Sequence, residues 1–246
     1  MEILGIDIGG SGIKGAPVNT KTGMLIVDRF RIKTPVGGEP EDVARVVTEL
    51  VRHFDWNGRV GIGIPAPIKH GILKMAANIS PAWVGINADA FLTQATGCDV
   101  TVGNDADVAG LAEMTFGAGK GQAGTIILIT LGTGIGSAVF HQGLLLPNTE
   151  FGHLEIDGLD AESKASDAAR QRENLPWKKY ARRLNRYLLE MEKLFWPDLF
   201  IIGGGISKEH EKYLPFLTVE AAVVPAQFLN EAGIVGAALA AKNEKE

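Results

Sequence analysis

Short apolar runs, most of them ended by glycine or proline, alternate with longer stretches of helical periodicity along the chain. The runs at 2–8, 59–64, 98–102, 125–130 and 198–202 are rich in Ile, Val and Leu, which is typical of buried strands. Strands that alternate with helices predict an α/β fold. Helices are expected, from apolar spacing and composition, at 39–54, 89–96, 106–116, 176–196 and 230–241.

The first strand ends in the segment DIGGSGIKG, in which Gly10, Gly12 and Gly15 match the pattern G-x-G-x-x-G. A dinucleotide-binding fold needs a helix next, but Pro17 and the turn-like residues 19–23 oppose one. We therefore expect a strand, a glycine turn and a second strand, with backbone N–H groups that face phosphate oxygens. The alternative is a tight turn that simply needs glycine.

A second strand–glycine–strand segment follows at 125–140, where LGTGIG separates two apolar runs. Because one such loop is a common turn, the repetition is the informative feature. Two similar loops predict two related half-sites that hold one ligand bearing several phosphates. They also predict two similar α/β lobes with a cleft between them.

The stretch VGNDADVAG joins a strand to a helix, with Asn104 at the junction and Asp105 and Asp107 beside it. Ligands of open α/β sheets bind at the carboxyl ends of the strands, where an Asp can accept a proton from a substrate hydroxyl. The competing interpretation is that Asn104 and Asp105 only cap the helix.

Polar residues on two loops suggest a sugar site. Asn78 and Trp83 offer an amide and a ring, although a loop Asn is more often a turn former. Glu150, His153, Glu155 and Glu162 suit a polyol, whose buried hydroxyls each need a partner. A solvated acidic turn is the alternative, and a zinc site is not expected because H-E-x-x-H and nearby cysteines are missing.

The longest predicted helix, 176–196, has a basic side on which Lys178, Arg182 and Arg186 recur at helical spacing. Such a face is usually only solvated, but in an acidic protein it could steer a polyanion. The glycine run 203–205 follows a buried strand and lets a backbone pass close to a flat or phosphorylated group.

The composition and charge of the chain argue against several classes of function. The 246 residues carry a net charge of −5, which gives no reason to expect nucleic acid or a membrane surface as partner. Cys98 is the single cysteine, which fits a reducing cytosol and predicts a cytoplasmic protein. The uncharged stretch 121–140 is long enough to raise a membrane question, but its glycines and threonines favour two strands.

The motifs GIDIGGSGIKG, GNDAD, TLGTGIG, EFGH and GGGIS occur in the order and spacing of the ROK (repressor, ORF, kinase) family of sugar kinases. The segments NTEFGHLEIDGLDAESKAS, PWKKYARRLNRYLLEME and NEAGIVGAA resemble the polyphosphate-using branch of that family. The resemblance implies the actin-like ATPase (ribonuclease H-like) fold, two α/β lobes with an inter-lobe cleft. It implies a small N-terminal lobe at 1–107, a large C-terminal lobe at 108–229, and a last helix, 230–246, that returns to the first lobe.

The resemblance further implies phosphoryl transfer from inorganic polyphosphate, ATP or both to the 6-hydroxyl of glucose. Asp105 corresponds to the general base, and a homodimer is usual in the family. The sugar ligands expected are Asn78, Asn104, Asp105, Glu150, His153 and Glu162. The donor site is expected at Gly9, Gly10, Ser11, Gly12, Lys14, Thr130, Gly132, Thr133 and Gly134, with Asp7 holding Mg²⁺ through water and Gly203, Gly204 and Gly205 near adenosine.

One departure from the family pattern matters. Many members carry a zinc-binding, cysteine-rich motif after the Gly-His pair, and this chain has no cysteine there, so no zinc is expected and His153 is a sugar ligand only. The chain also starts at the first strand, without the helix-turn-helix of the repressor members. Three alternatives stay open: an ATP-dependent hexokinase, a glucomannokinase that also accepts mannose, and a non-catalytic sugar sensor.

Overall fold

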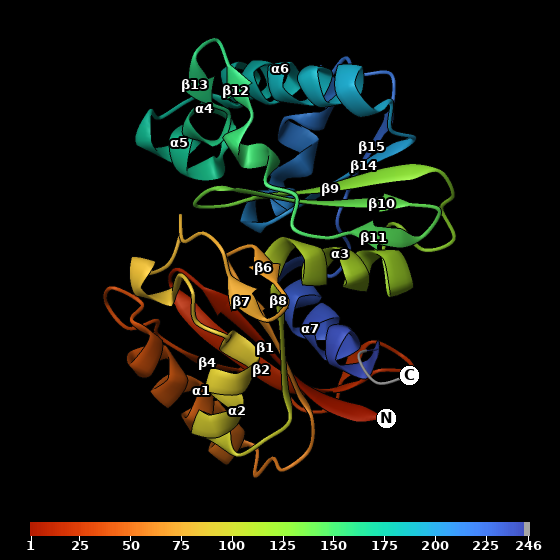
Figure 1. The fold of residues 1–246 in the computed structure, drawn as a ribbon. Coiled ribbons are helices and arrows are strands. Elements are labelled where there is room, and N and C mark those ends of the chain that lie inside the picture. Colours follow the sequence, from red (N-terminus) through yellow and green to blue (C-terminus); the bar gives the residue numbers. More distant parts are fainter. Residues whose placement is uncertain (244–246) are drawn as a thin grey trace. The chain divides into compact units, whose positions relative to one another are not determined.

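The computed structural model describes residues 1–243, which form two compact units. Unit 1 comprises Met1–Ala112 and the segment that begins at Glu231, and unit 2 comprises Glu113–Asn230. Each unit has its own sheet with helices packed against it (Figure 1). The division falls inside helix α3 (Asp105–Phe116), and the lobe boundary after residue 107 stays a prediction. Residues 244–246 of the predicted last helix lie outside the described residues.

The sheet of unit 1 runs in the order β3-β2-β1-β5-β8, with β4 paired to β2. Only two residues, Gly10 and Ser11, join β1 to the antiparallel β2, so the predicted glycine hairpin is confirmed and a helix after the glycine motif is excluded. β1, β5 and β8 are parallel neighbours, and their carboxyl ends therefore meet at one edge. The strands are β1 (Glu2–Gly9), β2 (Gly12–Asn19), β3 (Met24–Leu25), β4 (Phe30–Ile32), β5 (Val60–Ile64) and β8 (Val100–Asn104).

Alternation along the strands separates the two faces of this sheet. Leu4 and Ile6 of β1 join the core formed with α1 (Pro40–His53) and α2 (Ala88–Thr96). Gly5 lies on the opposite face of the sheet, where α7 (Ala232–Asn243) packs directly on β1 and β5. A short hairpin of β6 (Ile68–Lys69) and β7 (Ile72–Leu73) and the turn η1 (Pro81–Trp83) occupy the segment that the sequence left as a loop.

The sheet of unit 2 runs in the order β11-β10-β9-β14-β15. β9 and β10 form the second predicted glycine hairpin, and β14 lies parallel to β9. The predicted long helix is α6 (Trp177–Phe195), whose apolar side packs into the core of this unit. The strands are β9 (Thr125–Leu131), β10 (Ile135–His141), β11 (Leu144–Leu146), β14 (Leu199–Gly203) and β15 (Ala222–Pro225).

Smaller elements complete unit 2. Between β11 and α6 they are η2 (Phe151–His153), β12 (Glu155–Ile156), β13 (Leu159–Asp160), α4 (Glu162–Ala165) and α5 (Asp167–Arg172). After β14 they are η3 (Gly205–Lys212), η4 (Leu214–Phe216) and η5 (Leu229–Glu231). Within residues 1–243 there is no helix with the length and apolar character that crossing a membrane demands.

Candidate functional site

Asp105 stands at the carboxyl end of β8, as the first residue of α3. Asn104 holds this junction: its Oδ1 accepts from the N–H groups of Ala106 (2.9 Å) and Asp107 (3.0 Å), and its Nδ2 donates to the carbonyl of Ala66 (3.3 Å). The capping interpretation of Asn104 is therefore correct, and a contact with sugar stays a prediction. The half-buried carboxylate of Asp105 accepts from the N–H of Ala106 (2.8 Å), which fixes its position at the sheet edge.

The first glycine loop lies at the same edge of unit 1, because β1 is the parallel neighbour of β5 and β5 of β8. A Cβ on Gly10 would meet no atom within 4 Å, so open space borders the loop there. A cavity of about 370 Å³ includes Gly9, Gly10 and Asn78 among its lining residues. The structure thus brings the predicted loop and the predicted amide of Asn78 to one cavity.

Asp7 and Lys14 face each other across the β1–β2 ladder, and Lys14 Nζ lies 3.0 Å from Asp7 Oδ2. Both side chains are largely buried, so the ammonium group holds the carboxylate beside the loop. A single carboxylate next to a phosphate loop fits a Mg²⁺ ion that keeps its waters and takes its other ligands from the donor phosphates. The pairing also means that Lys14 is shared between Asp7 and any phosphate.

Arg31 and Thr34 are two loop contacts that the sequence did not reveal. Arg31 Nη2 donates to the carbonyl of Ser11 (2.6 Å), and a Cβ on Gly12 would lie 2.2 Å from Arg31 Nε. Thr34 Oγ1 donates to the carbonyl of Gly9 (2.5 Å) and also lines the cavity. Arg31 reaches the loop because its strand, β4, pairs with β2. β4 is short and mostly exposed, so its sequence gives little indication of a strand.

Trp83 corrects one sequence expectation. Its ring is fully buried in the core of unit 1, and its Nε1 donates to the carbonyl of Gly38 (2.9 Å). A ring enclosed in this way offers no face to a sugar. The sequence around Trp83 did not predict the burial of its ring, because a Trp in a loop has the same sequence context whether the ring is exposed or buried.

In unit 2 the two glycine segments are side by side. Gly203 of β14 pairs with Thr130 of β9, and a Cβ on Gly204 would lie 2.3 Å from the carbonyl oxygen of Leu131. Cβ atoms on Gly132 and Gly205 would both enter open space. The predicted donor loop and the predicted adenosine loop therefore share one edge, with room beside each.

Glu150 and His153 flank the turn η2, which lies against β10. The approach requires glycine, since a Cβ on Gly152 would lie 2.4 Å from the carbonyl oxygen of Ile135. Ser137 Oγ fixes the same turn by accepting from the N–H of Phe151 (3.0 Å). Burial raises the pKa of Glu150, and His153 opposes that shift while Glu162 adds to it.

Glu162 begins α4, and its Oε2 accepts from the N–H of Ile135 (3.2 Å), at the end of the second glycine loop. Its charge acts on both Glu150 and His153, so the structure groups the three predicted sugar residues of unit 2. His153 Nδ1 lies 3.0 Å from Asp160 Oδ2, a partner that sequence analysis had not assigned. Among residues 1–243, no group of three or more His, Cys, Asp and Glu side chains is arranged to hold a metal ion.

Comparison with known proteins decides the family. The family model described as "ROK family" matches residues 3–173, more than half of the chain. The chain belongs to the ROK family. Its fold is the actin-like ATPase fold of that family, with the mixed α/β content of both sheets described above.

Two relatives that span nearly the whole chain are named as sugar kinases. A polyphosphate glucokinase of Mycobacterium tuberculosis is 48% identical over 237 residues, which cover 96% of this chain and 89% of the relative. A glucokinase of Thermotoga maritima is 27% identical, with 97% of this chain and 96% of the relative covered.

Solved ROK structures agree. An inorganic polyphosphate/ATP-glucomannokinase from Arthrobacter matches with a TM-score of 0.94 and 50% identity, covering 97% of each chain. A glucokinase of Streptomyces griseus, solved with glucose and AMPPNP, matches with a TM-score of 0.84 and 25% identity over 98% of this chain and 99% of that one.

Proposed function

We propose that this ROK protein is a polyphosphate glucokinase, which transfers a phosphoryl group from inorganic polyphosphate, and also from ATP, to the 6-hydroxyl of glucose. The observation that carries the proposal is the placement of Asp105 at the carboxyl edge of β1, β5 and β8, the same sheet edge as a glycine loop that borders open space. The identity to relatives of that name over nearly the whole chain supports it.

Phosphoryl transfer needs an oriented hydroxyl and neutralised phosphate charge more than covalent help. In our proposal Asp105 accepts the proton of the 6-hydroxyl as the oxygen attacks the terminal phosphorus of the donor. The bond between that phosphorus and the bridging oxygen breaks, and the donor leaves as ADP or as polyphosphate shortened by one phosphate. Its backbone anchor at Ala106 and the cap by Asn104 hold the carboxylate in one orientation before the sugar arrives. Rigid placement matters because a small misplacement of the base loses much of the rate.

Glucose needs both donors and acceptors for its hydroxyls. We assign acceptors to Glu150 and Glu162, an imidazole to His153, and amides to Asn78 and Asn104. The half-buried positions of Glu150, His153 and Glu162 support this, because carboxylates there can accept hydrogen bonds from hydroxyl groups with little competition from water.

The donor phosphates are assigned to the two glycine loops. In the first loop the residues are Gly9–Gly12 with Lys14, and Arg31 is added as a further cation. In the second they are Thr130 and Gly132–Gly134, while Gly203–Gly205 takes the adenosine end of ATP. The N–H of Gly132 donates to the carbonyl of Gly134 (3.0 Å), so we assign the phosphate donors to Thr133 and Gly134. Asp7 would hold Mg²⁺ through water, and the ion would supply positive charge to the transferring group.

A Gly132→Ala variant tests the donor loop. A methyl group there would occupy open space that we assign to a phosphate, so the KM for the donor should rise about tenfold to a hundredfold. The midpoint of thermal unfolding should stay unchanged because the methyl group meets no protein atom. A KM equal to that of the wild type would remove the loop from the donor site.

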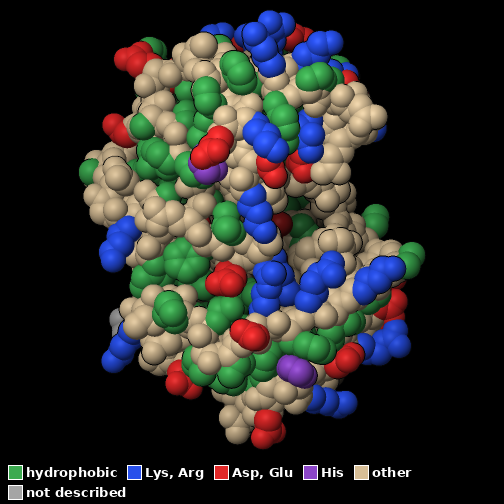
Figure 2. Space-filling model, turned by 180° about the vertical axis from the view of Figure 1, so that it is seen from behind, with side chains coloured by type: hydrophobic (Ala, Val, Ile, Leu, Met, Phe, Trp, Pro, Cys, Tyr) green, Lys and Arg blue, Asp and Glu red, His purple; other side chains and the backbone are tan. Residues whose placement is uncertain are grey.

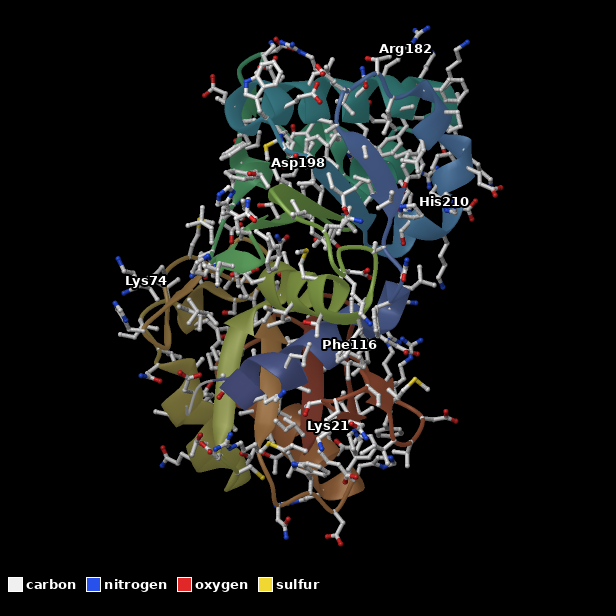
Figure 3. The ribbon with its side chains drawn as sticks, turned by 90° about the vertical axis from the view of Figure 1, so that its right-hand side faces the viewer. Lys21, Lys74, Phe116, Arg182, Asp198 and His210 are labelled. Carbon is white, nitrogen blue, oxygen red and sulfur yellow. The ribbon has the colours of Figure 1, made fainter. Side chains whose placement is uncertain are left out.

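The basic side of α6 is assigned to the distal part of a long polyphosphate chain. Lys and Arg side chains crowd the end of unit 2 formed by this helix (Figure 2), and Arg182 points outward from it (Figure 3). A cavity of about 380 Å³ includes Lys164, Arg182 and Arg186 in its lining. Arg186 already pairs with Glu190 and Asp157, and Lys178 lies over the ring of Phe216. Arg182 should therefore contribute most.

Replacing Lys178, Arg182 and Arg186 together by Gln should raise the KM for polyphosphate about tenfold and leave the KM for ATP near its original value. The physical reason is that only the long polyanion extends beyond the loops. The matched control removes the same charge from exposed Lys21, Lys120 and Lys193. Equal effects on both donors, or an equal effect of the control, would refute this role.

The test of the proposed function is a coupled assay for glucose 6-phosphate, with polyphosphate and ATP supplied separately. Turnover with polyphosphate supports the proposal, turnover with ATP alone supports an ATP-dependent glucokinase, and no turnover with either supports a sugar sensor. Mannose in place of glucose tests the glucomannokinase alternative, which the Arthrobacter neighbour favours.

We also propose a homodimer in the cytoplasm. Strand β11 lies at the edge of the unit 2 sheet and exposes Leu144 and Leu146, two apolar side chains on an open edge. Sedimentation equilibrium of the wild type and of a Leu144→Lys variant would measure the assembly. The cytoplasmic location rests on the single cysteine of the sequence.

A further inference from the structure

A hairpin that follows η2 returns the chain to His153. Strands β12 and β13 pair Glu155 with Asp160 and are joined by Asp157 and Gly158, both with positive φ (53° and 78°). Two such residues form the tight turn that suits a two-residue hairpin, and Asp-Gly is its preferred sequence. The turn thereby fixes the register that sets Asp160 against His153, seven positions earlier.

The contact between these residues decides the tautomer of the imidazole. Asp160 Oδ2 lies 3.0 Å from His153 Nδ1, and a carboxylate can only accept, so Nδ1 carries the hydrogen. Nε2 is then the ring nitrogen left for a ligand on the other side of the ring. A His side chain with one nitrogen held by a carboxylate is a common way to orient the other.

Charge around the ring acts in the same direction. The hydrogen bond that His153 Nδ1–H donates to Asp160 is the largest cause that raises the pKa of His153, burial opposes it, and the charges of Glu162, Asp160 and Glu150 add to the rise. Three carboxylates thus act on one imidazole: Glu150, which precedes η2, Asp160 of β13 and Glu162 of α4. The protonated ring offers Nε2–H as a hydrogen-bond donor among groups that otherwise accept.

We propose that Asp160 is a positioning residue for the sugar: it holds Nδ1 of His153 so that Nε2–H donates to a hydroxyl oxygen of glucose. The inference rests on the proposed function, since it names how one assigned sugar ligand is oriented. Glu150 and Glu162 accept hydrogen bonds from hydroxyl groups of the sugar, and His153 supplies the complementary donor. Sugar affinity then depends on the protonated ring, and it weakens as the pH rises through the pKa of His153.

Two substitutions separate orientation from charge. Asp160→Asn keeps an oxygen that can accept from Nδ1–H but removes the charge, so the pKa of His153 should fall and the KM for glucose should begin to rise at a lower pH than in the wild type. Asp160→Ala removes both, so the KM for glucose should rise about tenfold at neutral pH, the loss expected for one misdirected charge-assisted hydrogen bond. Because Asp160 also lines the cavity assigned to polyphosphate, loss of its negative charge should not raise the KM for polyphosphate in either variant.

The matched control is Asp157→Asn, on the same hairpin and with the same change of charge. Asp157 lines the same cavity as Asp160 but is 78% exposed and pairs at 3.6 Å with Arg186 rather than with His153. It should leave both the pKa of His153 and the KM for glucose unchanged. Asn favours the positive φ of this position, so the turn is preserved.

The experiment combines two measurements on the full chain. NMR titration follows the imidazole signals of the five histidines, with His153→Gln used to assign the signal of His153. Steady-state kinetics at several pH values gives the KM for glucose at saturating polyphosphate. The expected result is a lowered pKa and a shifted glucose profile in Asp160→Asn alone.

Two results would overturn the inference: an unchanged pKa of His153 in Asp160→Asn, or a lowered pKa with an unchanged glucose profile. A wild type without glucose phosphorylation would remove the proposed function instead. In that case the titration still measures the Asp160–His153 contact, and calorimetric titration of glucose across the same pH range replaces the kinetic profile.

Discussion

An Asp105→Asn variant should lose about 10²- to 10⁴-fold in kcat, the contribution typical of a general base in proton transfer. An amide cannot take the proton of the sugar hydroxyl, but its oxygen can still accept from the N–H of Ala106, so the start of α3 should survive. Glucose binding should therefore change little. The coupled assay measures kcat, and calorimetric titration measures the dissociation constant for glucose.

The control for this variant is Asp99→Asn, which also removes one carboxylate from unit 1. Asp99 is exposed and pairs with Arg59 at 3.6 Å, a surface contact that contributes little to stability. It should keep full activity. Less than a tenfold fall in kcat for Asp105→Asn, with glucose binding intact, would show that Asp105 only caps the helix.

The second large effect is on stability. A Cβ on Gly236 of α7 would lie 1.5 Å from the carbonyl oxygen of Val108, and one on Gly61 would lie 1.8 Å from that of Ala237. Backbone groups inside a helix cannot move aside as a flexible side chain does. Gly236→Ala should therefore lower the free energy of unfolding by about 3 kcal/mol or more, at or above the upper end for overpacked positions.

Denaturant titration followed by circular dichroism measures this loss. Gly132→Ala makes the same chemical change at a site with open space, and it should unfold at the midpoint of the wild type. The two variants should therefore have opposite effects: Gly236→Ala should lose stability and Gly132→Ala should lose affinity for the donor. An unchanged midpoint for Gly236→Ala would contradict the close packing of α7 against α3 within unit 1.

Local patterns predicted much of the fold. The apolar runs ended by glycine predicted both hairpins, and apolar spacing over 176–196 predicted α6, whose buried side includes Leu184, Leu188 and Met191. These features depend on neighbours within a few residues, so the sequence carries them directly. Asn104 also belongs here, because a cap acts on N–H groups two and three residues away.

The contacts of the site were decided by tertiary structure. Trp83 was expected at a sugar and lies in the core, while Arg31 reached the first loop only because β4 pairs with β2. The Asp-Gly pair before Asp160 is typical of a hairpin turn and could have been recognised in the sequence. The contact of Asp160 with His153 depends on the register of that hairpin, which the structure supplies. The sequence by itself determined the family, the two glycine hairpins and the acid at position 105, because motifs and periodicity are local. Only the tertiary structure decided which side chains meet, because those contacts depend on strand pairing and on the packing of segments far apart in the chain.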